Sequence, residues 1–315
     1  MKVLILGGTR FIGVALTKLL VAQGHEVVLL NRGNNPAPVE GVRTIICDRT
    51  QPAALQAALQ HESFDVIFDN NGRELADTQP LVELFEGRIR HFVYVSSAGV
   101  YQESETLPHF EGDATDPQSR HRGKLETEAY LHRAYQEKGF PYTAIRPVYI
   151  YGPGNYNDVE AWFFDRIAHD RPIPIPGNGK FITQLGHVED LAAAMVAVLG
   201  NSQTIGEIYN ISDMRYVTYK GIAEACARAM GKNPSDLKFV FYDPKQFDFG
   251  KQKAFPFRLQ HFFCSIDKAL NHLDWEPEYD LVTGLKSSYE KDYVHQDRSG
   301  VSFSVDDMIL ERVKS

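Results

Sequence analysis

Apolar positions in the first two thirds of the chain fall into short continuous runs that alternate with segments of helical period. Continuous runs of Val, Ile and Leu are typical of strands buried on both faces of a parallel sheet. They predict strands at 2–6, 26–30, 44–47, 65–68, 92–96, 142–145 and 208–211. Helical spacing between the runs predicts helices at 11–23, 52–60, 78–85, 124–136 and 188–199. This alternation predicts an α/β fold with a doubly wound parallel sheet of the Rossmann type.

The pattern changes after residue 147. Gly, Pro and Asn cluster at 152–157 and 171–180, and helical spacing returns at 219–230, 266–273 and 281–292. The last residues form an amphipathic piece within an otherwise polar end. We therefore expect a dinucleotide-binding domain at 1–150 and 181–213, a smaller substrate-type domain at 151–180 and 214–296, and a C-terminal tail at 297–315.

Composition limits the possible classes of protein. With 43% hydrophobic and 23% charged residues, the chain of 315 residues has ordinary globular values. No apolar run approaches the length of a membrane span, so we expect no membrane partner. Three scattered cysteines fit a reducing compartment and do not suggest a disulfide framework or a zinc site. A net charge of −8 argues against a protein whose whole surface binds nucleic acid, but it does not exclude a local basic patch.

A Gly-rich turn follows the first predicted strand and opens the first predicted helix. It consists of Gly7, Gly8, Thr9, Arg10, Phe11, Ile12 and Gly13. The first glycine allows a tight turn, the last lets helix and strand pack closely, and the helix start offers N–H groups to a pyrophosphate. Arg10 replaces the usual middle glycine, so it either clamps the pyrophosphate or crowds it. The turn predicts a dinucleotide site, and the alternative is a turn without a ligand.

The second predicted strand leads into a neutral and a cationic residue, Asn31 and Arg32. An acidic residue near this place would bind the ribose 2′-hydroxyl of NAD. An amide and a guanidinium suit a 2′-phosphate better, so the sequence favours NADP over NAD. Asp48 follows the third strand and is placed to meet the adenine. The plainer alternatives are a solvated turn residue for Arg32 and a loop cap for Asp48.

Three motifs together resemble the extended short-chain dehydrogenase/reductase superfamily, whose best-known members are sugar-nucleotide epimerases and dehydratases. They are the glycine turn, Val-Ser-Ser-Ala-Gly-Val-Tyr at 95–101, and Arg-Pro-Val-Tyr-Ile-Tyr-Gly-Pro-Gly at 146–154. The resemblance covers nearly the whole chain, since 187–192 and 274–277 match as well. It also implies that subunits associate into a homo-oligomer.

In that superfamily a Ser or Thr and a Tyr-x-x-x-Lys pair perform the chemistry. Ser97 matches the hydroxyl and Lys124 matches the lysine, but Arg120 stands where the tyrosine is expected. A guanidinium stays protonated up to about pH 12 and cannot act as the base. The departure predicts that the standard hydride chemistry is disabled, unless a neighbour such as His121 substitutes.

Polar residues at the ends of the predicted strands add candidates. Asn70 and Asn71 follow the fourth strand and would line the same cleft as Ser97. Asp48 and Asp69 offer oxygen ligands to Mg²⁺, although no compact carboxylate motif defines a metal site.

The segment 120–124, Arg-His-Arg-Gly-Lys, opens a predicted helix. Exposed cations at a helix start cost about 0.3–1 kcal/mol each, and an anionic partner would reverse the sign. One explanation is an external phosphodiester held by Arg120, Arg122 and Lys124, with His121 as a base. The other is local neutralisation by Glu111, Asp113 and Asp116.

The stretch 243–263 interleaves aromatic with basic residues. Single-stranded nucleic acid needs this combination, because rings stack on bases and cations follow phosphates. The candidates for RNA contact, besides Arg120 and Arg122, are Lys245, Lys251, Lys253, Phe255, Phe257 and Arg258. The alternative is that the phenylalanines form the core of the smaller domain.

The glycine turn, 119–128 and 247–258 sharpen the resemblance, because together they look like the chloroplast stem-loop-binding proteins and their cyanobacterial relatives. That resemblance implies binding of structured RNA or ribosomes, and in some members a metal-dependent endoribonuclease activity. Because the chain starts without a Ser- and Arg-rich leader, we expect a cyanobacterial-type cytoplasm or a mature protein of the plastid stroma. Two rivals stay open: an NAD(P)-dependent nucleotide-sugar epimerase, dehydratase or reductase, and a non-catalytic scaffold that holds the dinucleotide as a ligand.

Overall fold

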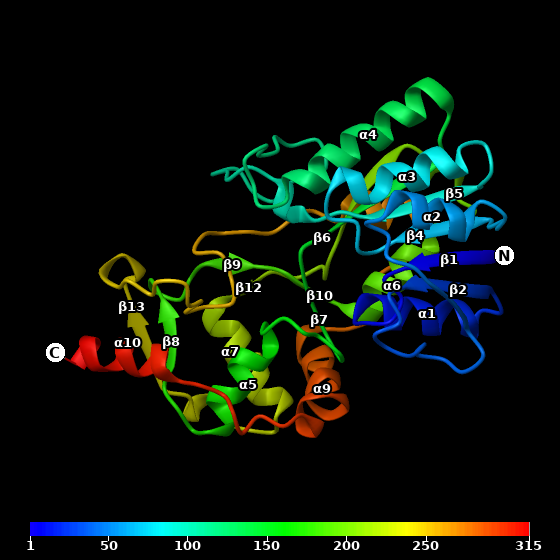
Figure 1. Ribbon diagram of the computed structural model, residues 1–315. Helices are drawn as coiled ribbons and strands as arrows, with labels where there is room; N and C mark the ends of the chain where they lie inside the picture. Colours follow the sequence, from blue (N-terminus) through cyan, green and yellow to red (C-terminus); the bar gives the residue numbers. More distant parts are fainter. Residues whose placement is uncertain (315) are drawn as a thin grey trace. The chain divides into compact units, whose positions relative to one another are not determined.

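The computed structural model describes residues 1–314, which form two compact units (Figure 1). The first unit comprises Met1–Val148, Val188–Ser212 and Cys264–Glu276, and the second comprises Tyr149–His187, Asp213–Phe263 and the chain from Pro277 onward. No helix of the described residues combines the length and the apolar character that a membrane crossing requires.

The first unit is built on a seven-stranded sheet whose neighbouring strands are all parallel, in the order β11-β6-β5-β4-β1-β2-β3. The strands are β1 (Lys2–Leu6), β2 (Glu26–Asn31), β3 (Arg43–Ile46), β4 (Val66–Asp69), β5 (His91–Val95), β6 (Tyr142–Pro147) and β11 (Glu207–Ile211). The helices are α1 (Ile12–Ala22), α2 (Pro52–Leu59), α3 (Leu75–Phe85), α4 (Arg122–Lys138), α6 (Val188–Ala197) and α8 (Asp267–His272).

Helices cover both faces of this sheet. In Figure 1, α1 and α6 lie on one face and α2, α3 and α4 on the other. Because of this double cover β4 and β5 are buried along their whole length, which is why they read as continuous apolar runs. The predicted doubly wound α/β fold is confirmed.

The second unit contains three small two-stranded sheets. They pair β7 (Tyr149–Tyr151) with β10 (Leu185–His187), β9 (Ile182–Thr183) with β12 (Val217–Thr218), and β8 (Ile173–Pro176) with β13 (Phe239–Tyr242). The helices are α5 (Glu160–Ala168), α7 (Tyr219–Ala229), α9 (Leu281–Lys291) and α10 (Ser304–Lys314). Short 3₁₀ turns occur in the two units at η1 (Ala98–Val100), η2 (Ser202–Thr204), η3 (Pro234–Asp236), η4 (Pro244–Gln246) and η5 (Tyr293–His295).

Apart from one or two residues at the boundaries after Val148 and Ser212, this division differs from the predicted domains at three places. Residues 181–187 form β9 and β10 and belong to the second unit. Residues 264–276 return to the first unit, where α8 packs against β11 and the Trp275 indole donates to the Asp190 carbonyl at 3.1 Å. The expected tail is part of the second unit, because α10 packs on β8 and β13 and Asp306 pairs with Arg166 at 2.7 Å.

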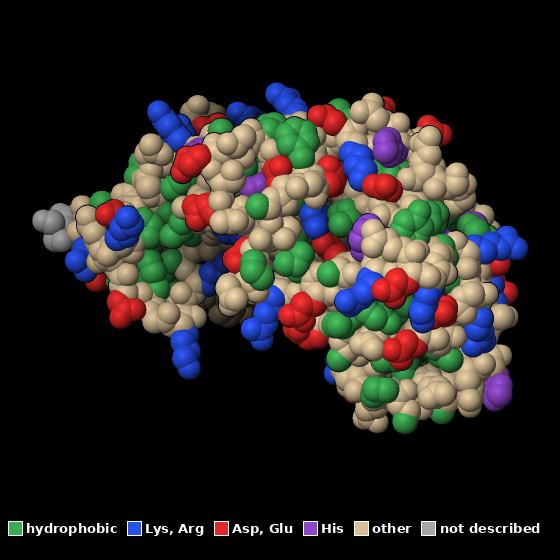
Figure 2. Space-filling view, turned by 90° about the horizontal axis from the view of Figure 1, so that it is seen from above, with side chains coloured by type: hydrophobic (Ala, Val, Ile, Leu, Met, Phe, Trp, Pro, Cys, Tyr) green, Lys and Arg blue, Asp and Glu red, His purple; other side chains and the backbone are tan. Residues whose placement is uncertain are grey.

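Charged side chains of both signs are mixed over the surface. On the face drawn in Figure 2, Lys and Arg side chains lie among Asp and Glu side chains, and no region of one sign covers it. A site that attracts an anion on this protein must therefore be local.

Candidate functional site

The glycine turn connects β1 to α1 through a close approach of backbone to backbone. Gly7 has a φ of +82°, which favours glycine. A Cβ on Gly13 would lie 1.9 Å from the Gly7 carbonyl oxygen, so no side chain fits where the helix passes the turn. Arg10 is exposed at the apex, and Phe11 adopts a φ of +43°, which is strained for a bulky residue. The turn has the shape of a phosphate cradle at a helix start.

Buried polar groups without a partner gather at the carboxyl ends of three strands. They are the Asn31 Nδ2 at the end of β2, both amide atoms of Asn70 after β4, and the Ser96 Oγ after β5, and none has a hydrogen-bond partner within residues 1–314. Buried polar atoms in native proteins are nearly always satisfied by protein, water or a ligand. In open α/β sheets, ligands bind outside the carboxyl ends of the strands. This edge therefore fits a polar ligand such as a dinucleotide.

The residues expected around the adenosine end lie together. Arg32, Cys47, Asp48 and Gln51 border a hollow of about 450 Å³ beside Ile46, whose side chain is 73% exposed. Asp48 accepts hydrogen bonds from the Thr50 N–H and hydroxyl at 3.0 and 2.8 Å, which lower the pKa of its carboxyl. Asp48 is thus a loop cap that also borders the hollow. Asn31 braces the turn after β2, because its Oδ1 accepts from the Gly33 N–H at 2.7 Å.

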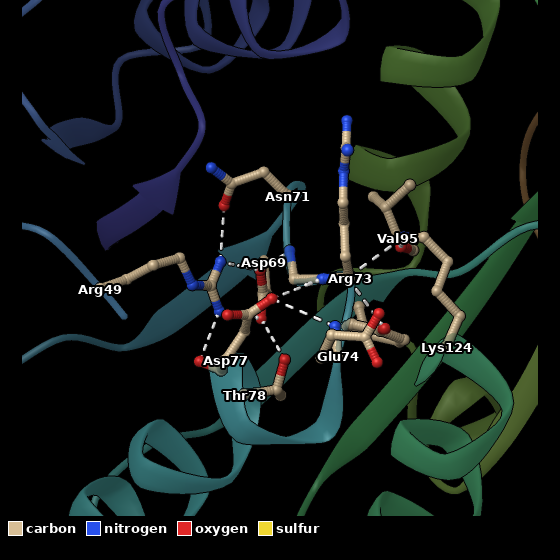
Figure 3. A network of polar contacts seen from close by, with 11 residues as sticks. Arg49, Asp69, Asn71, Arg73, Glu74, Asp77, Thr78, Val95 and Lys124 are labelled. Carbon is tan, nitrogen blue, oxygen red and sulfur yellow. Dashed lines mark hydrogen bonds and ion pairs between the residues drawn. The ribbon is translucent and has the colours of Figure 1, made fainter. Parts of the chain in front are cut away.

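A buried ion pair that sequence reasoning missed lies next to this edge. Figure 3 shows the Arg49 guanidinium pointing to Asp69, Asn71 and the Asp77 backbone. It donates to both Asp69 oxygens at 2.5 and 2.7 Å, to the Asn71 Oδ1 at 2.5 Å and to the Asp77 carbonyl at 2.8 Å. Asn71 in turn lies against Gly7, because a Cβ added to Gly7 would be 3.0 Å from the Asn71 Cγ. Arg49 therefore fixes the amide that borders the glycine turn.

The contacts of Asp69 do not fit the metal-ligand role that the sequence suggested for it. Its oxygens also accept from the Gly72 N–H at 2.9 Å and the Thr78 hydroxyl at 2.7 Å, so both are engaged. Burial raises the pKa of this carboxyl, but Arg49 and the hydrogen bonds outweigh burial and hold it below its ordinary value. Among residues 1–314 no group of three or more His, Cys, Asp or Glu side chains is arranged to hold a metal ion.

Ser97 and His121 meet above one glycine. The Ser97 Oγ accepts from the Gly99 N–H at 3.0 Å. A Cβ on Gly99 would lie 3.0 Å from the Ser97 Oγ and 2.6 Å from the His121 Nε2, so both side chains border the same point. The His121 Nε2 accepts from the Arg120 Nε at 3.1 Å, which occupies the nitrogen that a base would use. The structure thus brings together the side chains of Ser97, Arg120 and His121.

The start of α4 carries two arginines that form no ion pair among the described residues, although the Glu74 carboxylate lies close to Gly123. Arg120 and Arg122 are exposed, and the first turn of the helix contains no acidic residue. The expected local neutralisation is not found, because Asp113 accepts from the Phe110 N–H at 2.9 Å and Asp116 from the Gln118 N–H at 2.8 Å. Glu111 likewise accepts from the Asn210 N–H at 2.9 Å, and no ion pair of the described residues involves Arg120 or Arg122. The helix dipole adds to this positive field.

Lys124 points into the sheet, as Figure 3 shows. Its Nζ donates to the Val95 carbonyl at 2.6 Å and to the Gly72 carbonyl at 3.2 Å, and it lies 5.3 Å from the Tyr94 ring centre. Burial lowers the pKa of this ammonium to about 8, although Asp69 and Glu128 oppose the shift. An ammonium has three donors, so one more acceptor can be bound beside these two carbonyls.

The lowered pKa of Lys124 predicts a pH-dependent difference in stability. Between pH 8 and 10.5 Lys124 is protonated in the unfolded chain but deprotonated in the folded protein. The free energy of unfolding therefore increases with pH over this range. Against a Lys124→Met variant, the wild-type unfolding free energy should gain about 2–3 kcal/mol between about pH 7 and pH 10. Urea unfolding of both proteins across this range measures it, and a difference that does not change with pH would refute it.

The predicted RNA contacts in the second unit separate into two groups. Phe255 and Phe257 are only 4% and 5% exposed and belong to the core around Trp162 and Phe163, so they cannot stack on bases as predicted. The core alternative is correct for these two rings. Lys245, Lys251 and Lys253 are exposed, and the Arg258 guanidinium lies over the Phe262 ring at 4.3 Å.

Comparisons with known proteins agree with this geometry. Residues 3–212 match the model of the NAD dependent epimerase/dehydratase family. The "Chloroplast stem-loop binding protein of 41 kDa b, chloroplastic" of Arabidopsis thaliana is 49% identical over 99% of this chain and 84% of its own length. The 2'-dehydrokanamycin reductase of Streptomyces kanamyceticus is 26% identical over 74% of this chain and 67% of its own.

Solved structures of sugar-nucleotide enzymes share the fold. The UDP-glucose 4-epimerase of Thermotoga maritima, solved with UDP-glucose, aligns with a TM-score of 0.77 at 21% identity over 92% of this chain and 98% of that one. The UDP-glucose 4-epimerase of Thermus thermophilus, solved with NAD, aligns with a TM-score of 0.75 at 21% identity over the same shares. The chain belongs to the NAD-dependent epimerase/dehydratase family and, within it, to the branch of the chloroplast stem-loop-binding proteins.

Proposed function

We propose that this protein binds structured RNA, ribosomal RNA included, and that the start of α4 holds its phosphodiester backbone. One observation carries the proposal: Arg120 and Arg122 are exposed at a helix start, where no described acid pairs with them. Phosphate contacts from arginines and helix N-termini are the common means of positioning nucleic acid. The name of the Arabidopsis relative, a stem-loop-binding protein, supports the same ligand class.

Proton transfer of the epimerase type lacks a base in this cleft. Arg120 cannot release its proton near neutral pH. The neighbouring phenols do not replace it, because Tyr101 is 2% exposed and donates to the Asn210 Oδ1 at 2.7 Å, and burial raises the pKa of its hydroxyl. Burial likewise raises the pKa of Tyr94. A phenol that serves as a base needs a lowered pKa.

We further propose that the edge of the sheet holds a dinucleotide, NADP in preference to NAD. The glycine turn fits a pyrophosphate, and the unpartnered Asn31, Asn70 and Ser96 groups fit a polar ligand. Arg32 borders the hollow where a 2′-phosphate would add charge. When bound, the nicotinamide supplies hydride chemistry, whereas the residues of this chain bind and orient the ligand without a tyrosine base. This supports a ligand role, as in the scaffold hypothesis.

RNA cleavage through a protein-bound Mg²⁺ does not fit the described side chains. Asp69 is committed to Arg49, and Asp48 caps its own loop. We derive no cleavage step from a metal. The residues at the start of α4 can hold the RNA whether or not the RNA carries its own Mg²⁺.

Filter binding of the purified wild type to a labelled stem-loop RNA tests the proposal. We expect retention at low salt, an affinity that falls steeply as salt rises, and no loss on addition of EDTA. Thermal unfolding of the same sample with NADP and with NAD tests the dinucleotide proposal, with the larger upward shift expected for NADP. Absence of retention at low salt would overturn the RNA proposal, and turnover of a nucleotide sugar with NADP would favour the rival.

The cellular compartment that we propose is based on the same relative. The name of the Arabidopsis protein describes it as chloroplastic. We propose a plastid stroma or a cyanobacterial-type cytoplasm for this chain, with ribosomes as a partner and a homo-oligomer as the assembly.

A further inference from the structure

Two phenylalanine rings in the second unit form a stacked, partly exposed pair. Phe247 and Phe249 follow η4, and their ring centres lie 5.5 Å apart with planes only 4° from parallel. Tyr242, which is buried at the end of β13, meets them edge-on at 5.6 and 6.2 Å. The core thus fixes the orientation of the pair, while part of each ring remains accessible.

A hollow of about 540 Å³ opens beside this pair. It is lined by Phe247, Asp248, Met308, Glu311 and Arg312. The Arg312 guanidinium lies 5.3 Å from the Phe247 ring centre, and Met308 is 44% exposed. A ring, a thioether and a guanidinium around such a volume suit a flat aromatic ligand that is attached to an anion.

The chain that leads to and from the ring pair carries three exposed lysines. Lys245, Lys251 and Lys253 are exposed, whereas the carboxylates of Asp243 and Asp248 are engaged in turns, accepting from the Lys245 and Gly250 N–H groups at 3.0 and 2.9 Å. A Cβ on Gly250 would meet no atom within 4 Å. On the side of Figure 1 where β13 and α10 lie, Figure 2 shows apolar side chains on the surface with Lys or Arg side chains at their border.

We propose that this ring cluster, Phe247, Phe249 and Arg312, stacks an unpaired base of the bound RNA while the three lysines follow its phosphates. The inference rests on the proposed RNA binding and adds to it a contact that only unpaired nucleotides can make. In a duplex the bases are already stacked inside the helix, whereas the bases of a loop can turn outward onto a ring. The start of α4 would bind the phosphates of paired and unpaired RNA alike. A higher affinity for a stem-loop than for a duplex would therefore come from the ring cluster.

The test compares two RNAs and two double variants. Phe247→Leu/Phe249→Leu removes the rings but keeps most of their apolar volume. Phe239→Leu/Phe241→Leu is the control, because these rings also stack, with centres 6.4 Å apart, but are not among the residues that line this hollow. For the first variant we expect the affinity for a stem-loop to fall about tenfold or more and the affinity for the blunt duplex of the same stem to stay unchanged. The control should change neither affinity. Thermal unfolding of each variant checks that it folds.

The outcomes separate the inference from the proposed function. Unchanged stem-loop affinity in the first variant overturns the inference, leaves RNA binding intact, and means that the ring cluster serves another partner, such as a protein. Equal losses on both RNAs, or from both variants, also overturn it. Failure of the wild type to bind either RNA overturns the proposed function itself. If the first variant does not fold, photocrosslinking of a bromouridine loop to the wild type decides: crosslinks should map to Phe247 or Phe249, and crosslinks confined to other segments contradict the inference.

Discussion

Replacing Arg49 with methionine should lower the free energy of unfolding by about 3–5 kcal/mol, because the change leaves the Asp69 carboxylate buried without its counter-ion. The side chain of Asp69 is 0% exposed and that of Arg49 is 8% exposed, so water cannot take over the lost contacts. The Asn71 amide also loses its anchor beside the glycine turn. Urea unfolding of the two proteins near neutral pH measures the effect.

A surface ion pair is the matched control for this prediction. Arg43 donates to Glu62 at 2.7 Å, and its side chain is 47% exposed, so Arg43→Met should change stability by less than about 1 kcal/mol. Adding Asp69→Asn to Arg49→Met removes the buried charge and should recover part of the loss. A loss of similar size in the Arg43 and Arg49 variants, or no recovery in the double variant, would show that the buried pair is not what stabilises this edge.

Reversing the charges at the start of α4 should weaken RNA binding strongly. In Arg120→Glu/Arg122→Glu two cations that face solvent become anions that repel phosphate, and the affinity for a stem-loop at low salt should fall on the order of 10- to 100-fold. The variant should remain folded, because no ion pair of the described residues involves either arginine. Filter binding and thermal unfolding measure the two quantities.

The same helix offers the control. Arg133 is exposed on α4 and contacts the Tyr130 ring at 6.0 Å, away from the helix start. The single variants Arg133→Glu and Arg122→Glu change the net charge by the same amount at two different positions on α4. A difference between their affinities for RNA therefore reports the effect of position alone. If both weaken RNA binding equally, the start of α4 is not the contact and only net charge matters.

The first unit could be predicted almost completely from the sequence. Its inner strands, such as β4 and β5, lie between two layers of helices, so each is a continuous apolar run that the chain pattern marks directly. The glycine turn was equally visible, because Gly13 must be a glycine for α1 to pass β1. Asn31, Arg32 and Asp48 could be placed near one another because parallel strands end at one edge.

The second unit could not be predicted in this way. Its strands are two to four residues long, and β8 reads Ile-Pro-Ile-Pro, where prolines argue against a strand. Helix α5 was missed because buried Glu160, Asp165 and Arg166 interrupt its apolar face, and each is satisfied by a distant partner. Such partners become known only when the fold is known.

Two features of the candidate sites were hidden for the same reason. Arg49 follows the edge strand β3, and its partner Asp69 ends β4, three positions away in the sheet order, so no spacing in the sequence connects them. Among the phenylalanines of 247–257, composition does not tell which rings are buried. Only the packing against Trp162 and Tyr242 shows that Phe255 and Phe257 form core and that Phe247 and Phe249 reach the surface.

The salt dependence of RNA binding tests the central claim most directly, since it counts the phosphates that a protein neutralises. The logarithm of the affinity for one stem-loop is plotted against the logarithm of salt concentration for the wild type and for Arg120→Glu/Arg122→Glu. If the two guanidiniums at the start of α4 each bind one phosphate, the variant loses two phosphate contacts. Its slope should then be shallower by about 1.8, which is about 0.9 for each lost contact. Equal slopes and equal affinities in the two proteins would contradict it.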